Sequence, residues 1–303
     1  MNNNLFFTKY HVYLLTEKRV SKNTCDAYKR DLSQFDAFLA KENLELRRVQ
    51  IKDLKLFIKK LHAQKLSPRS LARKISSLKA FFNFLHERYD IENVAADLTF
   101  PKLDKKLPRY LPEQELKELL DVTEKDTSPV GLRNKVMVYL LYVSGMRVSE
   151  LVGLKISDIH FDTGIIDMAG KGGKGRVVPV PHAMITLIKE HLKRPPKTHL
   201  QGNSNANKTE YLFPTTYAGK IKPITRQALF IVLKRLWQQT SIKKTISPHT
   251  LRHSLATHLL KNGADLRSLQ MLLGHENLGT VQIYTHVEIS HLRAIYDKKH
   301  PRS

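Results

Sequence analysis

Six residues beyond position 140 combine cations, proton carriers and a phenol, the groups needed for phosphoryl transfer by a tyrosine nucleophile. They are Arg147, Lys171, His249, Arg252, His275 and Tyr284. A phenol can attack phosphorus, and arginine suits the two non-bridging oxygens because its guanidinium is planar and always charged. Histidine and lysine can carry protons to and from the attacking and leaving oxygens. Because arginines could neutralise the phosphate, we expect neither a metal ion nor another cofactor.

The first pattern is the segment Gly145–Leu151, in which Arg147 precedes Glu150 by three positions, about one helical turn. A carboxylate at this spacing can hold the guanidinium in one orientation. Ion pairs on exposed helix faces are common, and for the pair taken alone this simpler explanation is the better one.

The second pattern is the glycine-rich segment Gly170–Gly175, which presents Lys171 and Lys174. A phosphate-binding P-loop would continue with Ser or Thr and a helix after its lysine, whereas Arg176 and a predicted strand follow here. The segment therefore predicts a hairpin turn with basic residues at its tip. Taken alone, it is adequately explained as a solvated turn.

The third pattern is the segment Ser247–His253, where Pro248 fits the first turn of a helix. His249 and Arg252 are three positions apart and therefore share a helix face. His249 and His253 have the spacing of a zinc-binding pair. However, the position of the glutamate that zinc hydrolases of this type use is taken by Thr250. We therefore expect no metal ion at this helix.

Further along the chain, His275 follows Gly274, which predicts the C-terminal end of a helix over Asp265–Leu273. A histidine there is ordinarily a cap or core residue, and Tyr284 taken alone would be a half-buried aromatic. The simpler explanations become less convincing when the arginines, lysine, histidines and tyrosine are considered together. Phosphoryl transfer by a tyrosine nucleophile needs all of these groups.

The elements expected to position these groups are mostly helical. Helical apolar spacing covers Glu113–Asp121 and Arg133–Val143, and the last third of the chain predicts helix after helix. Between them the period changes to that of strands in Gly164–Met168 and Arg176–Val180, which predicts a small antiparallel hairpin. A polar loop is expected over residues 195–210.

Residues 1–100 predict a domain of four helices with little strand signal. Apolar residues recur at helical spacing in Leu5–Glu17 and Ile51–Leu61. Ser21 and Ser67 are the expected N-caps of the second and fourth helices. The buried stripe expected on the fourth helix consists of Leu71, Ile75, Leu78, Phe82 and Leu85.

One stretch of this domain, Leu54–His86, contains many lysines and arginines and no Asp or Glu. Arg69 and Arg73 are one helical turn apart, and Lys74 follows. Like charges at that spacing destabilise an isolated helix, and a partner rich in phosphates would reverse the cost. A solvated surface is the alternative, but such surfaces usually mix signs. We therefore predict that these three residues contact DNA, and that Lys174 in the glycine-rich segment of the second domain does so too.

The whole chain is basic, with 51 Lys and Arg against 28 Asp and Glu in 303 residues and a formal net charge of +23. This excess favours a polyanion such as nucleic acid as the partner. Prolines among basic residues between Phe100 and Pro112 predict a linker over 101–111, with a DNA-binding domain over 1–100 and a catalytic domain over 112–303. A single cysteine, no signal peptide and no membrane span favour a cytoplasmic protein.

Together these segments resemble the tyrosine recombinase (integrase) family over nearly the whole chain. The matching motifs are Ser144–Leu151, Gly170–Gly172, His249–Arg252, Leu273–His275 and Gln282–Val287. Because the resemblance extends over nearly the whole chain, the sequence is most similar to the Xer-type site-specific recombinases. The segment Ile224–Gln227 favours the XerD branch over the XerC branch. The resemblance implies a mainly α fold. A four-helix SAM-like core-binding domain would precede a mixed, mostly helical catalytic domain with a small antiparallel β-sheet.

The resemblance also implies roles for the candidate residues. Arg147 and Arg252 would bind the scissile phosphate, and His275 would assist them through a hydrogen bond. Lys171 would protonate the leaving 5′ oxygen, and His249 would act as general acid and base near the tyrosine.

Glu150 would orient the site, and Tyr284 would form a 3′-phosphotyrosyl link that conserves bond energy for rejoining.

In this family, four protomers on two DNA sites exchange strands through a Holliday junction. The expected partners are a dif-like DNA site and a companion Xer recombinase or further copies of this chain, with a septal DNA translocase as a candidate activator. The expected role is to resolve chromosome dimers during segregation. A C-terminal helix over Glu288–Lys298 would pack on a neighbouring protomer or on its own domain.

Three other functions share part of this pattern. A DNA-binding regulator on the same scaffold would not need Tyr284 and both arginines. A topoisomerase-like enzyme would share the chemistry without exchanging partners, so dependence on paired sites would separate the two. A phage or transposon integrase often carries an extra N-terminal arm-binding module, for which the sequence gives no sign.

Overall fold

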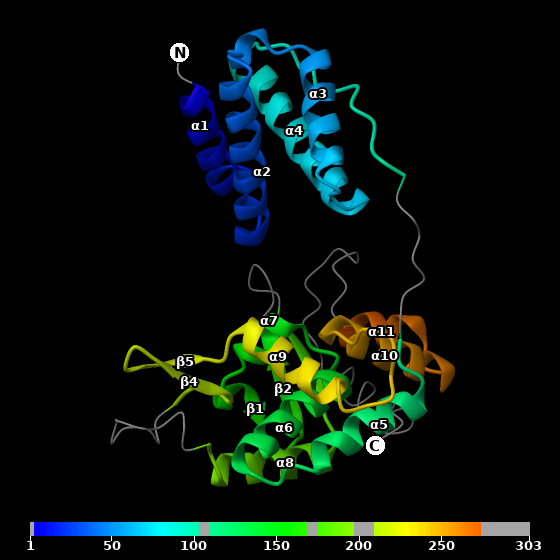
Figure 1. Ribbon diagram of the computed structural model, residues 1–303. Coiled ribbons are helices and arrows are strands. Elements are labelled where there is room, and N and C mark those ends of the chain that lie inside the picture. Colours follow the sequence, from blue (N-terminus) through cyan, green and yellow to red (C-terminus); the bar gives the residue numbers. More distant parts are fainter. Residues whose placement is uncertain (1–2, 103–109, 169–174, 197–208, 274–303) are drawn as a thin grey trace. The chain divides into compact units, whose positions relative to one another are not determined.

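The computed structural model describes residues 3–102, 110–168, 175–196 and 209–273 (Figure 1). The chain divides into two compact units, Met1–Lys106 and Leu107–Ser303. This division falls inside the range 101–111 predicted as a linker. Helices dominate both units and small antiparallel sheets occur in the second, so the predicted mainly α fold class is confirmed.

The first unit is a bundle of four α-helices around one apolar core (Figure 1). The helices are α1 (Asn3–Thr16), α2 (Lys22–Lys41), α3 (Ile51–Ala63) and α4 (Pro68–Tyr89), with a 3₁₀ helix at Leu46–Arg48. Ser21 and Ser67 cap α2 and α4, each accepting a hydrogen bond of 3.2 Å from a backbone N–H of the first turn. The apolar stripe predicted on the fourth helix is buried along its whole length.

The second unit is built around α6, which contacts α5, α8, α9 and α10. The helices among its described residues are α5 (Glu113–Glu124), α6 (Pro129–Ser144), α7 (Val148–Val152), α8 (His182–Lys193), α9 (Arg226–Trp237), α10 (Pro248–Lys261) and α11 (Leu266–Leu273). Almost every residue of α6 from Val136 onwards is buried, because its side chains are apolar around the whole helix. This central helix supports the segment that follows it, which carries Arg147.

A three-stranded antiparallel sheet has the order β1 (Ile159–His160), β2 (Ile165–Met168) and β3 (Arg176–Pro179), and a 3₁₀ helix at Ile156–Asp158 precedes it. The two predicted strands pair with each other, and Met168 lies opposite Arg176. The predicted hairpin tip and most of the loop predicted over 195–210 lie outside the described residues.

A second hairpin, β4 (Pro214–Tyr217) with β5 (Lys220–Pro223), shows that the prediction of helix after helix was wrong at this point. Its turn holds Ala218 and Gly219, which both have positive φ, at 50° and 72°. Two-residue hairpin turns of type I′ need positive φ at both central positions. In the described part of the chain, no helix is long and apolar enough to cross a membrane.

Candidate active site

Arg147 follows a sharp turn at the end of α6. Gly145 ends that helix in the left-handed region with φ of 57°. A Cβ atom on Gly145 would come within 2.8 Å of Leu273 and 2.9 Å of Leu255. Glycine is therefore required both by the backbone conformation and by the close approach of these two side chains.

The contact predicted between Arg147 and Glu150 is present. The backbone N–H of Arg147 donates to Glu150 Oε2 at 2.6 Å, and Arg147 Nη1 donates to Oε1 at 2.9 Å. The Glu150 side chain is 8% exposed and that of Arg147 is 42% exposed. A buried carboxylate thus holds a guanidinium whose outer part faces solvent.

Arg176, which the sequence marked only as the start of a strand, also binds Glu150. Its Nη1 and Nη2 donate to the two carboxylate oxygens at 2.7 and 2.9 Å, and its Nε donates to the carbonyl of Leu272 at 3.1 Å. Arg176 is buried. Glu150 lies 26 positions away in the chain, so no local spacing could reveal this pairing.

Arg252 reaches the same place from α10, which Ser247 caps by accepting a 3.2 Å hydrogen bond from the N–H of Thr250. Arg252 Nη1 donates to the carbonyl of Gly145 at 2.5 Å, and Nη2 donates to the carbonyl of Leu273. His249 lies one turn earlier on α10 and is exposed. The helix therefore presents His249 and Arg252 together, as their spacing predicted.

The resulting cluster holds three guanidiniums, from Arg147, Arg176 and Arg252, around the carboxylate of Glu150. Burial and the neighbouring charges of Arg176 and Arg147 lower the pKa of Arg252 to about 10. Arg252 therefore remains charged at neutral pH, and the cluster carries a net positive charge. An anion such as a phosphodiester would relieve the repulsion among the guanidiniums.

Lys171, Lys174, His275 and Tyr284 lie outside the described residues, as does the predicted C-terminal helix. The described chain nevertheless shows where two of their segments begin. The segment with both lysines joins β2 to β3, whose ends meet at the Met168–Arg176 pair. His275 follows two positions after Leu273, whose carbonyl binds Arg252.

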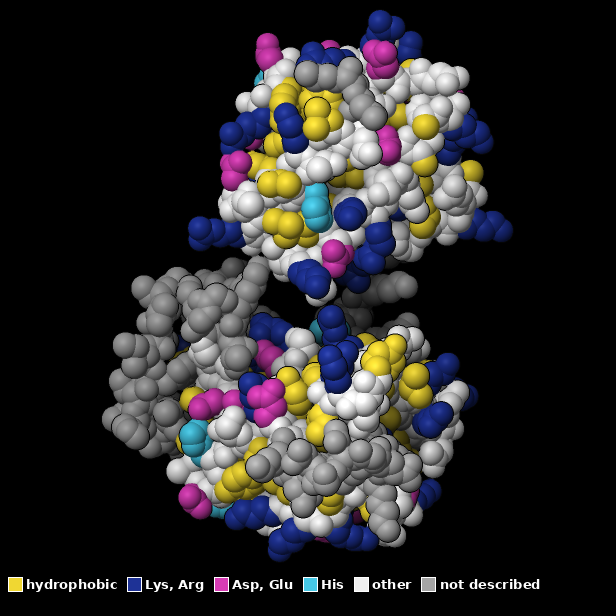
Figure 2. Space-filling view, turned by 90° about the vertical axis from the view of Figure 1, so that its left-hand side faces the viewer, with side chains coloured by type: hydrophobic (Ala, Val, Ile, Leu, Met, Phe, Trp, Pro, Cys, Tyr) yellow, Lys and Arg dark blue, Asp and Glu magenta, His cyan; other side chains and the backbone are white. Residues whose placement is uncertain are grey.

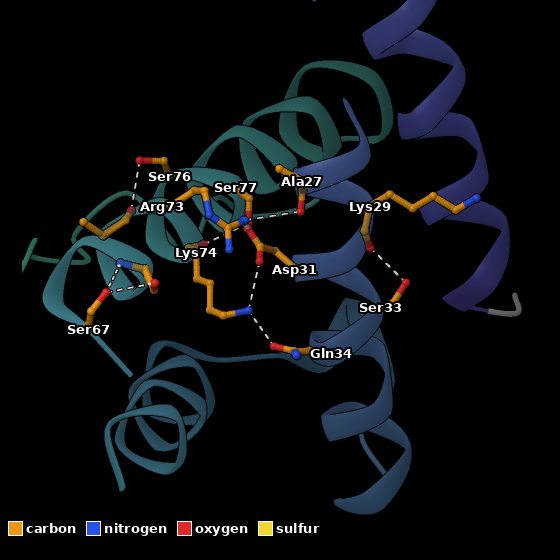
Figure 3. A network of polar contacts seen from close by, with 12 residues as sticks. Ala27, Lys29, Asp31, Ser33, Gln34, Ser67, Arg73, Lys74, Ser76 and Ser77 are labelled. Carbon is orange, nitrogen blue, oxygen red and sulfur yellow. Dashed lines mark hydrogen bonds and ion pairs between the residues drawn. The ribbon is translucent and has the colours of Figure 1, made fainter. Parts of the chain in front are cut away.

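Two of the three basic residues predicted to contact DNA in the first unit, Arg73 and Lys74, pair with Asp31 (Figure 3). Arg69 is exposed, and Arg73 is 43% exposed although it pairs with Asp31. Lys74 is only 7% exposed, and its Nζ donates to Asp31 at 2.9 Å and to Gln34 at 2.5 Å. DNA contact by all three residues stays a prediction, and Lys74 also stabilises the interior of the bundle.

Figure 2 shows lysine and arginine side chains over both units on the face that it draws. Among the residues with described positions, no three or more His, Cys, Asp or Glu side chains gather into a site that could hold a metal ion.

Two family models match the chain. The model of the phage integrase family matches residues 109–291, and that of the phage integrase N-terminal SAM-like domain matches residues 7–88. The first match covers every candidate catalytic residue.

Curated relatives match along almost the whole chain. The tyrosine recombinase XerC of Oceanobacillus iheyensis is 39% identical over 99% of this chain and 97% of its own length. The tyrosine recombinase XerD of Listeria monocytogenes is 38% identical over 96% of this chain and 97% of its own length. The two names occur at almost the same identity, so the predicted preference for the XerD branch stays a prediction.

Among solved structures, the XerH site-specific recombinase bound to difH substrate in a pre-cleavage complex has a TM-score of 0.67 and 26% identity. That match covers 89% of this chain and 78% of XerH. The arginine cluster, both family models and the full-length relatives agree. The chain belongs to the phage integrase family of tyrosine recombinases, enzymes that cleave and rejoin DNA, and within that family to the Xer type.

Proposed function

We propose that this recombinase acts on a dif-like site in duplex DNA and resolves chromosome dimers during segregation. Relatives named XerC and XerD and the XerH complex with difH support this target. The observation that carries the catalytic part of the proposal is the convergence of Arg147 and Arg252 on Gly145–Glu150 and the end of α11.

In the proposed cleavage step, Arg147 and Arg252 bind the two non-bridging oxygens of the scissile phosphate. Their positive charge stabilises the extra negative charge of the transition state. Both guanidiniums are already held by protein acceptors, so little reorganisation is needed when DNA arrives. His275 is proposed to add a hydrogen bond to the same phosphate.

The phenolic oxygen of Tyr284 forms a bond to phosphorus while the bond from phosphorus to the 5′ oxygen breaks. His249 accepts the phenolic proton, and Lys171 donates a proton to the leaving 5′ oxygen. A 5′-hydroxyl from the partner strand reverses the reaction, which rejoins DNA without ATP and passes through a Holliday junction. The phosphorus keeps its ester bond to the 3′ oxygen throughout and exchanges one other P–O ester bond for a new one in each step, so the number of ester bonds does not change.

The assembly is proposed to contain four protomers on two DNA sites, with a companion Xer recombinase or with further copies of this chain. A septal DNA translocase is the proposed activator, and the cytoplasm is the proposed location. The basic composition supports the DNA partner directly.

A nicked duplex tests this proposal, because the nick traps the covalent intermediate. The duplex carries the dimer-resolution site of the host chromosome and is incubated with and without a companion recombinase. We expect a protein–DNA adduct on a denaturing gel, and we expect none on a duplex with a scrambled site. Tight binding without any adduct, even with the companion present, would contradict the proposal and favour a DNA-binding regulator.

DNA binding is expected to depend steeply on salt, because log K falls by about 0.9 per phosphate neutralised for each unit of log salt. Arg69→Ala should make this slope shallower by about one. Arg194→Ala is the matched control, since Arg194 is also exposed but pairs with Glu190 on its own helix. Fluorescence anisotropy over a salt series gives both slopes. An unchanged slope in Arg69→Ala would remove Arg69 from the DNA interface.

A further inference from the structure

Arg176 is held entirely by the protein itself. Each of its three guanidinium nitrogens donates a hydrogen bond of 2.7–3.1 Å, two to Glu150 and one to the carbonyl of Leu272. Its side chain is 6% exposed. A guanidinium with these contacts and this burial does not reach a phosphate, so it differs from Arg147, whose side chain is 42% exposed.

The two acceptors of Arg176 are linked to the two arginines proposed to bind phosphate. Glu150 also accepts hydrogen bonds from the backbone and side chain of Arg147. Leu272 precedes Leu273, whose carbonyl binds Arg252. Arg176 therefore contacts the groups on which both Arg147 and Arg252 depend.

The two hydrogen bonds between Arg176 and Glu150 restrict the orientation of the two side chains relative to each other. Two parallel N–H···O bonds join the planar guanidinium to the planar carboxylate, so rotation of either group would break one of them. Lysine presents a point charge on a flexible stem and cannot reproduce this arrangement. At the same time, Arg176 is paired with Met168 in the sheet, which fixes its backbone.

We propose that Arg176 is a positioning residue for DNA cleavage, which joins Glu150 to the end of α11 and thereby holds Arg147 and Arg252 in one arrangement before DNA binds. This inference rests on the proposed function, in which those two arginines bind the scissile phosphate. Without the contact, Glu150 could tilt and the end of α11 could move away from it. A shift of about 1 Å in a catalytic group can cost about a hundredfold in rate.

The variant Arg176→Lys tests the proposal in the full-length protein. In single turnover on the nicked duplex, we expect adduct formation to slow by about a hundredfold, while DNA affinity stays close to that of the wild type. Arg133→Lys is the matched control, because Arg133 is likewise a buried arginine of the second unit but lies on α6 and bonds to its neighbour Asn134. We expect that control to cleave at the wild-type rate.

A second substrate separates positioning from a general loss of structure. It carries a methylphosphonate at the scissile position, where a methyl group replaces one charged oxygen and reduces the need for well-placed cations. The rate ratio of wild type to Arg176→Lys should therefore be much smaller on this substrate than on the ordinary phosphate. A reduced fraction of folded protein would change both rates equally and leave the ratio the same. Should Arg176→Lys fail to fold, Arg176→Gln, which retains a donor for Leu272, replaces it in the same comparison.

The outcomes separate this inference from the function on which it rests. Wild-type protein that forms no adduct would overturn the proposed function, and the inference with it. An active wild type with an equally active Arg176→Lys would overturn the positioning role alone. So would a defect of equal size on both substrates.

Discussion

Tyr284→Phe is expected to abolish the covalent protein–DNA adduct completely and to leave DNA binding intact. The substitution removes one oxygen atom, which is the atom proposed to bond to phosphorus. Binding depends on the many lysines and arginines of a chain with a net charge of +23, and these are unchanged. The adduct is measured on a denaturing gel with the nicked duplex, and affinity is measured by anisotropy under the same conditions.

Tyr139→Phe is the matched control for this prediction. It removes a hydroxyl that donates to Glu124 of α5 at 2.8 Å, an exposed contact that involves no residue of the arginine cluster. Adduct formation should be normal in this variant. If Tyr284→Phe still forms an adduct, another side chain must be the nucleophile, and the role taken from the family motif would be wrong.

The first unit could be predicted from the sequence because its signals are local. Ser67 followed by Pro68 marks the start of α4, and the apolar stripe behind it is buried as its spacing requires. Capping and amphipathic spacing depend on residues within one or two helical turns of each other. The sequence of a short segment is therefore enough to predict these helices. The same holds for the contact between Arg147 and Glu150.

Contacts that depend on tertiary structure could not be predicted in this way. Arg73 and Lys74 both pair with Asp31 on α2, which lies 42 and 43 positions away in the chain, and the packing of α4 leaves Arg73 43% exposed but Lys74 only 7% exposed. Arg176 and its acceptor Leu272 are 96 positions apart. In both cases the partner becomes a neighbour only after the helices and strands have packed.

The family motifs and the structure point to different residues of the proposed site. Motifs identified Lys171, His275 and Tyr284, none of which lies among the described residues. The structure contributed Arg176 and the reason for Gly145, which no motif explains. Together they support the proposed phosphate site, in which protein acceptors already hold Arg147 and Arg252.

Glu150→Ala is expected to lower both the stability of the second unit and the rate of cleavage. It would leave the Arg176 guanidinium buried without its carboxylate, and removing one partner of a buried ion pair typically costs about 3–5 kcal/mol. It would also remove two hydrogen bonds from Arg147, so we expect adduct formation to fall by about a hundredfold. Thermal unfolding and single-turnover cleavage measure the two effects.

Glu124→Ala is the control for the stability measurement. Glu124 also has two partners, Lys135 and Tyr139, but its side chain is 47% exposed. Exposed ion pairs contribute at most about 1 kcal/mol, so the midpoint of unfolding should hardly change. Equal losses in both variants would show that the buried cluster contributes no more to stability than an exposed pair does.

The pH dependence of unfolding gives an independent test of the same cluster. Burial raises the pKa of the Glu150 carboxyl, but the hydrogen bonds and charge of Arg176 and the hydrogen bonds from Arg147 outweigh it, so the pKa lies below the ordinary 4.5. A lowered pKa in the folded state means that the stabilisation is fully present above the unfolded pKa and is lost as pH falls through the folded pKa. The wild type should therefore lose stability steeply below about pH 4.5. Glu150→Gln should be less stable at neutral pH and approach the wild type in acid, because protonation removes from the wild type the charge that the variant already lacks. Parallel curves for the two proteins across this range would mean that Glu150 is not the carboxylate that the arginines hold ionised.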